Sequence, residues 1–529
     1  MTFIKSSRLP FLSGVLFGTS YTPFPPWAIL FAYVPLMLFL AKDAKSPWEA
    51  FRGGWVVQFV LSLIGFHWIA HTAHEFGDFP WFLAVIVLLL FATFVHLHIP
   101  LAAWAAYELR SRFKLPTTAT YFLFAISLSM TERIWPMIFP WHAGYTLLWA
   151  ESPIAQWADI IGFWGLSALI LLTNAWLSWI WTQRSHRGKA LTHLAALAAI
   201  IALLWVGGQS RKEPWMKMDE TLRILATQAN IGNADKVYAE HGRGYQNAIT
   251  RKFVTLTQEG YQNFPNADLA VWPETSFPDY IDHPEQSYQR LEILKEGLGP
   301  YGKPLLTGAY AKDFKSPPQG GPPLSYNALF LVNPDGQVLS GPYRKTVLLA
   351  FGEYFPFSEQ FPQVLQWLPF ISNFGRGHGP QVLNLPRPDG SNVRLGGQIC
   401  YEGLFPDFSR GLSTEGAQIM VNVTNDSWFG TSFEPKQHMI MTLARALEVR
   451  LPLLRVTNTG ITSAIQASGE MLERSPSEKE WVGEFALGYQ KNPEVTFYTR
   501  YGHYDWVLLL IAMCGIVAAG WGHARTQRP

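Results

Sequence analysis

Long apolar runs separated by short polar clusters fill the chain up to about residue 207, and the pattern then changes. A helix needs roughly 20 mostly apolar residues to cross a bilayer. Residues 208–503 mix apolar and polar positions as a water-exposed domain does, and one further apolar run follows before a basic tail. The pattern predicts eight membrane spans, at about 10–24, 27–41, 54–72, 80–100, 117–134, 160–182, 190–207 and 505–523.

The first apolar run has features of a secretory signal peptide, because Lys5 and Arg8 precede it. A cleavable signal also needs small residues at its cleavage site, after the apolar run. Bulky Tyr21 and Trp27 stand there instead. We therefore expect the first helix to be retained.

The basic residues between the predicted spans indicate an orientation, because loops rich in Lys and Arg remain cytoplasmic. They gather after spans two, four and six and in the tail, at Lys42, Lys45, Arg52, Arg110, Arg112, Lys114, Arg184, Arg187, Lys189, Arg525 and Arg528. The alternate loops carry acidic residues such as Asp78 and Glu151. We predict a seven-helix membrane domain (1–207), an external domain (208–503), and an eighth helix with a cytoplasmic tail (504–529).

Within residues 208–503, short β-branched and apolar runs alternate with helical stretches. Strands are predicted at 222–227, 269–272, 304–308, 328–332, 337–339, 393–399, 418–423 and 453–456. Helical periodicity is clear over Gln437–Val449. A mixed sheet covered by helices belongs to the α/β class.

The composition is typical of a membrane protein and gives no support for a nucleic-acid partner. Only 15% of residues are charged, against about 25% in an average globular protein. The net charge of +2 offers no basic face for nucleic acid. The two cysteines, Cys400 and Cys514, cannot form a disulfide framework.

Three residues could carry chemistry. Cys400 lies where a predicted strand meets a helix, a turn that presents a nucleophile beside backbone N–H groups. Glu274 follows another strand beside Trp272, where desolvation would raise its pKa toward that of a general base. The ammonium of Lys345 would favour a nearby thiolate. Taken singly, such residues are more often a structural thiol, a solvated carboxylate or helix cap, and a surface charge. Cys514, within the last span, is interpreted as structural.

Three histidines near the outer end of the third span are candidates for a metal site. His67, His71 and His74 follow a spacing that can bind zinc. No second shell of carboxylates paired with these histidines is evident. We expect them to line a substrate cleft, and we expect neither a metal nor a cofactor.

The local sequences of the three candidates resemble a known superfamily. Trp272-Pro273-Glu274, Tyr343-Arg344-Lys345 followed by Gly352-Glu353, and Cys400-Tyr401-Glu402 are similar to the three motif regions of the nitrilase superfamily. With the predicted topology and the segments 65–69, 139–145, 156–159, 424–430 and 455–462, the chain resembles the apolipoprotein N-acyltransferase family. The resemblance implies an αββα sandwich in the external domain, and a multi-pass protein of the bacterial inner membrane whose catalytic domain faces the periplasm.

The resemblance also implies a two-step acyl transfer. Cys400, deprotonated by Glu274, would attack an acyl ester of a phospholipid, expected to be phosphatidylethanolamine, and form a thioester. Lys345 and a backbone N–H near Tyr401 would stabilise the oxyanion. The α-amine of a diacylglyceryl-cysteine lipoprotein would then accept the acyl chain.

The same resemblance assigns orienting roles to Glu353 and Glu402, and a monomer is expected on so broad a membrane base. One alternative is a membrane-bound amidase or thioesterase in which water resolves the acyl-enzyme, although eight spans exceed what a tether needs. Another is a transporter or lipid-binding scaffold, which should carry intramembrane charges. Charges are nearly absent from the middle of the predicted spans.

The stretch between Glu353 and Phe374 is rich in aromatic residues and proline. We expect it to form a lid that enters the outer leaflet of the membrane, with Phe355, Phe357, Trp367 and Phe370 on its apolar face. The alternative is that these side chains pack in the core of the domain.

Replacing Trp367 and Phe370 together by serine tests the lid hypothesis. We expect a folded protein with reduced lipid transfer, because the lid would lose its apolar contacts with the leaflet. Mass spectrometry of the acylated product measures the effect. Unchanged transfer by the folded variant would contradict the hypothesis.

Overall fold

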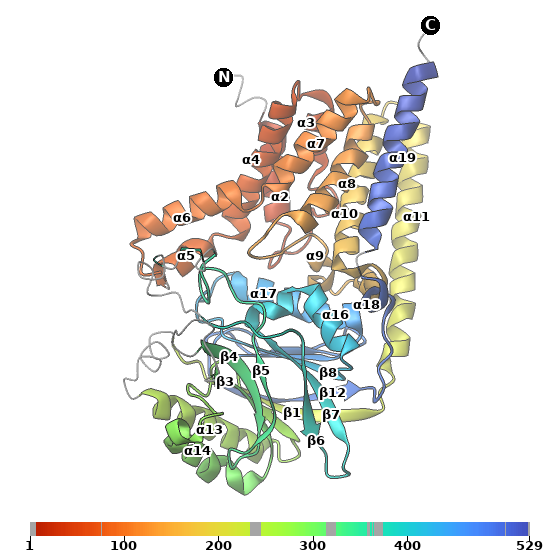
Figure 1. Cartoon of the computed structure of the whole chain (residues 1–529). Helices are drawn as coiled ribbons and strands as arrows, with labels where there is room; N and C mark the ends of the chain where they lie inside the picture. The colour runs from red at the N-terminus through yellow and green to blue at the C-terminus, as the bar shows by residue number, and fades with distance from the viewer. Residues whose placement is uncertain are drawn as a thin grey trace. The chain divides into compact units, whose positions relative to one another are not determined.

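The computed structural model describes residues 7–75, 77–232, 245–313, 324–356, 360–361, 363, 374–502 and 504–526. The chain forms two compact units (Figure 1). Unit 1 comprises Met1–His74, Asp78–Lys212 and Arg500–Pro529, and unit 2 comprises Glu75–Gly77 and Glu213–Thr499.

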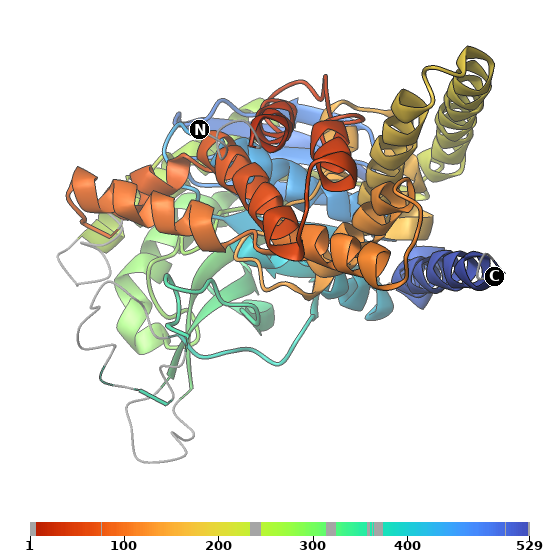
Figure 2. The same ribbon diagram turned by 90° about the horizontal axis from the view of Figure 1, so that it is seen from above.

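The regular secondary structure of unit 1, among its described residues, is helical. Its helices are α2 (Arg8–Gly18), α3 (Val34–Lys42), α4 (Pro47–Gly65), α5 (Trp68–Glu75), α6 (Trp81–Phe94), α7 (His98–Arg112), α8 (Ala119–Ile134), α9 (Tyr145–Trp149), η1 (Pro153–Trp157), α10 (Ala158–Thr182), α11 (Arg187–Lys212) and α19 (Asp505–Thr526). In Figure 2, α19 is seen nearly along its axis whereas α6 is seen from the side, so these two helices run at a steep angle to each other.

The prediction of eight spans is supported only in part. By length and composition, three described segments could cross a membrane, at 81–112, 153–182 and 187–216. The pair α4 and α5, bent by 59°, would make a fourth. The first two predicted spans are shorter than expected because the sequence Pro23-Phe24-Pro25-Pro26 separates α2 (11 residues) from α3 (9 residues), and a helix rises only about 1.5 Å per residue.

Apolar side chains cover the outside of the long helices of unit 1. Phe82 on α6 is 67% exposed and Leu203 on α11 is 71% exposed, and many neighbours on both helices are also exposed and apolar. Contiguous apolar surface of this kind indicates contact with lipid or another hydrophobic partner.

Polar contacts inside unit 1 hold its helices in place. Asn174 of α10 accepts a hydrogen bond from the Tyr33 backbone N–H (2.8 Å) and donates to the Ile29 carbonyl (3.0 Å). Arg133 of α8 pairs with Asp505 of α19. Because such groups are costly to leave unpaired in an apolar interior, these contacts restrict how the helices can pack.

The histidines considered as a metal site make other contacts. The Nδ1 atom of His67 lies 3.0 Å from the Ile64 carbonyl, and that of His74 lies 2.8 Å from the Phe79 carbonyl. The described residues contain no metal-like grouping of His67, His71 and His74.

Unit 2 is built on two six-stranded sheets. In spatial order, the first consists of β12 (Trp481–Tyr489), β1 (Glu220–Gln228), β2 (Leu269–Val271), β3 (Leu305–Asp313), β4 (Leu324–Val332) and β5 (Val338–Arg344). The second consists of β11 (Met471–Arg474), β10 (Ser463–Ile465), β9 (Leu453–Thr457), β8 (Ile419–Thr424), β7 (Asn392–Ile399) and β6 (Val382–Pro386). The central strands β1–β2–β3 and β7–β8–β9 are parallel, and the outer pairs are antiparallel.

Helices cover the outer face of each sheet. The helical segments are η2 (Glu213–Met216), α13 (Tyr245–Asn263), α14 (Pro284–Leu298), η3 (Gly299–Tyr301), η4 (Cys400–Leu404), α16 (Pro406–Thr414), α17 (Glu434–Val449) and α18 (Phe497–Tyr501), the last of which contains the boundary with unit 1. The α13 and α14 helices bury apolar side chains such as Phe253 and Leu294 in the core beside the first sheet. The α16 and α17 helices lie on the second sheet, and the sheets face each other (Figure 1). The predicted α/β class is therefore confirmed, with the layers helix, sheet, sheet and helix.

Gln228 joins the two sheets through buried hydrogen bonds. Gln228, at the end of β1, accepts hydrogen bonds from the hydroxyls of Thr457 (3.0 Å), Thr462 (2.8 Å) and Ser475 (2.8 Å). Its amide nitrogen donates to two backbone carbonyls. All four side chains are buried, so the glutamine satisfies polar groups that water cannot reach.

Gln228→Met should lower the stability of unit 2. The substitution keeps the side-chain volume but leaves three buried hydroxyls without their shared acceptor, at a cost of about 3 kcal/mol. Thermal unfolding of the full-length protein in detergent measures the loss. Gln262→Met, at an exposed glutamine of α13, is the control and should unfold near the wild-type temperature. Equal unfolding temperatures for Gln228→Met and the wild type would contradict this account.

Candidate active site

The three residues singled out from the sequence meet at one place in unit 2. Glu274 follows β2, Lys345 follows β5 and Cys400 follows β7, so each lies just beyond the carboxyl end of a strand. The Lys345 Nζ atom is 3.1 Å from Glu274 Oε1, and Cys400 is close enough for its charge to interact with both. Their exposed fractions are 7%, 1% and 9%. The site is thus nearly closed to water.

Lys345 is held between two carboxylates. Its Nζ atom lies 2.8 Å from Glu353 Oε1 in addition to its contact with Glu274. Burial disfavours the ammonium, but Glu274 and Glu353 more than offset this and hold the pKa of Lys345 well above its usual value. The lysine therefore presents a fixed positive charge, which suits stabilisation of an oxyanion.

Asn327 is a site residue that the sequence analysis missed. Its Nδ2 atom donates to Glu274 Oε1 (2.7 Å) and to Glu353 Oε1 (3.1 Å), so it fixes the spacing of the two carboxylates. Asn327 stands directly before the predicted strand 328–332, and the structure extends that strand to include it, as β4. A buried polar residue usually has a buried partner, but the identity of that partner depends on the tertiary structure.

The backbone at Cys400 adopts an uncommon conformation. Its φ of +50° lies in the left-handed region, which is rare for residues other than glycine and is often found at functional sites. Asn422 of β8 holds this turn by donating from Nδ2 to the Cys400 carbonyl (3.1 Å). The strand-to-helix turn predicted from the sequence is present, because η4 begins at Cys400.

Glu402 joins the turn at Cys400 to the segment after Lys345. Its Oε2 atom accepts from the Ile399 N–H (2.8 Å), and its Oε1 atom accepts from the N–H groups of Thr346 (2.6 Å) and Val347 (3.0 Å). Burial raises the pKa of Glu402 to about 7 despite these donors. These contacts fit the orienting role that the resemblance implied.

The thiol of Cys400 is protonated in the resting site. Burial and the nearby Glu274 raise the pKa of the Cys400 thiol well above its usual value, although Lys345 and the Thr424 hydroxyl lower it. The lysine thus favours the thiolate as expected, but burial and the charge of Glu274 outweigh its influence on the thiol pKa. A base is therefore needed, and Glu274 is the carboxylate beside the thiol. Its second oxygen accepts from the Asn425 N–H (3.0 Å).

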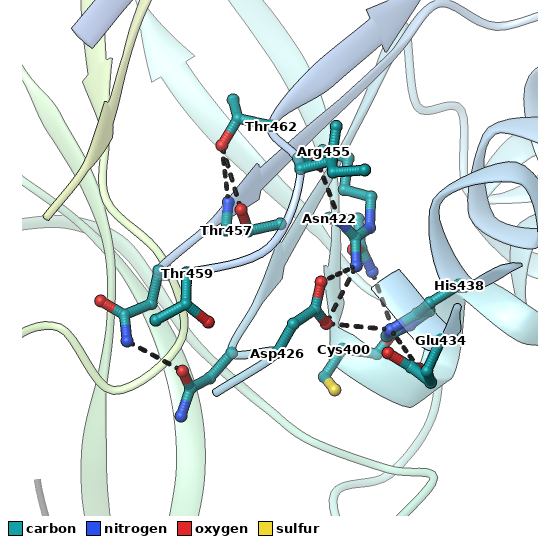
Figure 3. Close-up of polar contacts among 12 residues, drawn as sticks. Cys400, Asn422, Asp426, Glu434, His438, Arg455, Thr457, Thr459 and Thr462 are labelled. Atoms are coloured by element: carbon teal, nitrogen blue, oxygen red, sulfur yellow. Dashed lines mark hydrogen bonds and ion pairs between the residues drawn. The ribbon is translucent and has the colours of Figure 1, made fainter. Parts of the chain in front are cut away.

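A second group of charged residues lies beside the cysteine (Figure 3). Asp426 lies between Arg455, whose Nη2 atom is 2.8 Å from Asp426 Oδ2, and His438, whose Nδ1 atom is 3.2 Å from Asp426 Oδ1. The same Nδ1 atom is 3.4 Å from Glu434 Oε1. The backbone of Cys400 lies beside the His438 ring. Sequence reasoning noted the segments 424–430 and 455–462 but did not assign these residues to the site.

Asp426, Glu434 and His438 are spaced so that they could hold a metal ion. The guanidinium of Arg455 already bonds both Asp426 oxygens, at 3.1 and 2.8 Å, where a cation would bind. Burial opposes the charge of Asp426, but Arg455 and His438 lower its pKa to about 2. Burial and the Asp426 charge raise the pKa of Glu434 well above its usual value. The arrangement is therefore better suited to a buried ion pair than to a metal.

The remaining predicted site residues are only partly described. Tyr401 is buried and packs edge-on against Phe405, with ring centroids 4.9 Å apart. Phe355 is partly exposed and packs edge-on against Phe351 at 5.5 Å. Phe357, Trp367 and Phe370 lie outside the described residues, so the lid hypothesis stays a prediction.

Comparison with known proteins finds two matching families and many similar chains. Residues 225–487 match the carbon-nitrogen hydrolase family, which confirms a nitrilase-like fold for this part of the chain. Residues 13–176 match the family described as the apolipoprotein N-acyltransferase N-terminal domain.

Full-length relatives agree with both matches. The apolipoprotein N-acyltransferase of Bdellovibrio bacteriovorus is 52% identical over 521 residues, covering 98% of this chain and 95% of the relative. That of Geobacter metallireducens is 32% identical, and the match covers 96% of this chain and 94% of the relative. That of Pseudomonas syringae is 29% identical, with 92% of both chains covered.

Two substitutions beside the cysteine should show opposite pH trends. The folded-state pKa of Asp426, about 2, is below the unfolded value of about 3.9. Its stabilisation is therefore present above about pH 4 and is lost as the pH falls toward 2. Asp426→Asn should thus destabilise the protein most near pH 7 and less as the pH falls toward 3.

The raised pKa of Glu434 acts in the other direction. Its contribution is present below the unfolded value of about 4.3 and is lost as the pH rises through the folded pKa. Compared with the wild type at the same pH, Glu434→Gln should therefore be more stable at pH 8 than it is at pH 4. Unfolding temperatures between pH 2.5 and 8 measure both effects, with exposed Glu415→Gln as the control. Parallel pH profiles for the two variants would contradict the assigned charges.

Proposed function

The chain belongs to the apolipoprotein N-acyltransferase family, and from this premise we propose that Cys400 carries the acyl chain in its reaction. The protein is an N-acyltransferase that moves an acyl chain from a membrane phospholipid to the N-terminal amine of a diacylated lipoprotein. The observation that carries the proposal is the buried set of Glu274, Lys345 and Cys400, in which a protonated thiol lies beside a carboxylate and a fixed positive charge.

In the first step, Glu274 removes the thiol proton as the Cys400 sulfur attacks the ester carbonyl of the phospholipid. Negative charge develops on the carbonyl oxygen, and the Lys345 ammonium stabilises it. The tetrahedral intermediate then breaks its carbon–oxygen bond. The lysophospholipid leaves as an alcohol with the proton from Glu274, and the acyl chain stays on Cys400 as a thioester.

In the second step, the lipoprotein α-amine attacks the thioester carbonyl. Glu274 takes a proton from the amine, Lys345 again stabilises the oxyanion, and the carbon–sulfur bond breaks. The proton returns to the sulfur, which regenerates the Cys400 thiol. The two substrates therefore react in turn, in ping-pong order.

Acyl transfer is favoured over hydrolysis for two reasons. The relatives that match the whole chain carry the name of acyltransferases. The site is also nearly closed to water, since Cys400 and Glu274 are less than one tenth exposed. Exclusion of water protects a thioester from hydrolysis until the amine arrives.

Several finer points belong to the same proposal. We propose phosphatidylethanolamine as the donor, a monomeric enzyme, eight spans, and residues 208–503 as a catalytic domain that faces the periplasm. The positions of the basic loops support this orientation, because the clusters fall on one side of the predicted spans. The relatives and the long apolar helices of unit 1 indicate a bacterial membrane enzyme.

Cys400→Ala should abolish transfer, while Cys514→Ala, at the other cysteine of the chain, should retain it. The assay incubates purified protein with phosphatidylethanolamine and a synthetic diacylated lipopeptide. Mass spectrometry should find a third acyl chain on the peptide amine with the wild type and with Cys514→Ala. Glu274→Gln should form no thioester on Cys400, because the protonated thiol would lack its base.

Two results would overturn this mechanism. Transfer by Cys400→Ala would exclude the cysteine as the acyl carrier. Release of free fatty acid by the wild type without acylation of the peptide would favour the hydrolase alternative.

A further inference from the structure

The backbone of residues 374–379 runs directly beside the catalytic lysine. The Gly377 N–H donates to the Lys345 carbonyl (2.8 Å), and the Gly379 N–H donates to the Thr346 hydroxyl (3.1 Å). The Gly375 N–H donates to the Ser325 carbonyl (2.8 Å). This segment is therefore held against the strand ends that carry the active site.

Glycine permits this close approach. A Cβ atom added to Gly377 would lie 2.0 Å from the Arg344 carbonyl oxygen, and one added to Gly375 would lie 2.4 Å from the Tyr326 ring. Neither position has room for a side chain. The residue between them, Arg376, is consequently held at the edge of the site by its neighbours on both sides.

Arg376 is exposed and carries a charge that no carboxylate among the described residues neutralises. The centre of its guanidinium lies 4.4 Å from the centroid of the Tyr354 ring. A guanidinium that rests its face on an aromatic ring keeps the N–H groups along its edge free to bind oxygen atoms.

Tyr354 connects Arg376 to the catalytic groups. It directly follows Glu353, which pairs with Lys345. Its side chain also lies near that of Tyr401, the residue after Cys400. The guanidinium thus lies at the rim of the same site and not on a remote surface.

The charges inside the site make a rim cation useful. Lys345 is the cation between two carboxylates, Glu274 and Glu353, so the three groups together carry a net negative charge when Glu274 acts as a base. The phosphodiester of a phospholipid is also an anion, and like charges repel strongly where water is excluded. In a phosphoglyceride, only the glycerol carbons separate the reacting ester from the phosphate. A cation that binds the phosphate must therefore lie next to the nucleophile.

We propose that Arg376 binds the phosphodiester group of the acyl donor and so selects phosphoglycerides over uncharged acyl esters. This inference rests on the proposed function, in which the donor ester reacts at Cys400. Arginine suits the task because its planar fork donates two parallel hydrogen bonds to phosphate oxygens. Arg376 is a binding residue here and takes no part in bond making or breaking.

The test compares two acyl donors on the full-length enzyme in detergent. Phosphatidylethanolamine carries the phosphodiester, whereas p-nitrophenyl palmitate is an uncharged ester with no phosphate. Formation of the Cys400 thioester, followed by mass spectrometry over a range of donor concentrations, gives kcat and KM for acylation by each donor.

Arg376→Gln should raise KM for phosphatidylethanolamine about tenfold or more, because a hydrogen bond between charged groups is lost. Its kcat should change little, and its kinetics with p-nitrophenyl palmitate should match the wild type. Arg376→Lys keeps the charge without the fork and should be intermediate. Arg251→Gln, at an exposed arginine of α13, is the matched control and should leave both donors unaffected.

Each other outcome would overturn the inference. If Arg376→Gln slowed both donors equally, the residue would act on the chemistry or on the fold. If it changed neither, Arg376 would bind no donor group. Failure of the Cys400 mechanism itself would look different from failure of the Arg376 inference. The acyl chain would then be found on a residue other than Cys400 in the wild type, and acylation would persist in Cys400→Ala.

Discussion

The buried ammonium of Lys345 is the constraint on which the active site depends. A charge that is 1% exposed is stable only if its partners stay within bonding distance, and here Glu274 and Glu353 supply them. Removing one partner of such a group costs several kcal/mol, because the remaining charge is left uncompensated. Asn327, which bonds both carboxylates, is therefore as necessary to the geometry as the charged residues.

The two sheets hold these groups together from distant parts of the chain. Glu402 joins the turn of Cys400 on the second sheet to the segment after β5 on the first, and Gln228 joins the sheets a second time through buried hydroxyls. The left-handed backbone at Cys400 needs such support, since it costs on the order of 1–3 kcal/mol at a residue with a side chain. The bond from Asn422 holds the carbonyl of that turn.

The charges around Cys400 act differently before and after an ester binds in the proposed mechanism. Burial and Glu274 keep the Cys400 thiol protonated, so the free enzyme holds little reactive thiolate. In the proposed mechanism, Lys345 contributes most when charge moves from the sulfur to the carbonyl oxygen of a bound ester, where a fixed cation is favourable. On that proposal, the arrangement that keeps the cysteine protonated in the closed site also supports its attack once an ester is bound.

The sequence by itself determined the features that depend on local pattern. The strands that end at Glu274 and Cys400, the helical periodicity within α17 and the three local motifs could all be predicted, because alternation, periodicity and turn chemistry involve neighbouring residues. Hydropathy predicted eight spans, whereas three to four described segments meet the length requirement. At the first two predicted spans, a proline-rich segment separates two short helices. Only the tertiary structure identified Asn327, 53 residues from the Glu274 it bonds, and joined Asp426 to Arg455. These contacts unite residues far apart in the chain, and their partners are decided by the strand order within each sheet, which brings β2 near β4 and β8 beside β9.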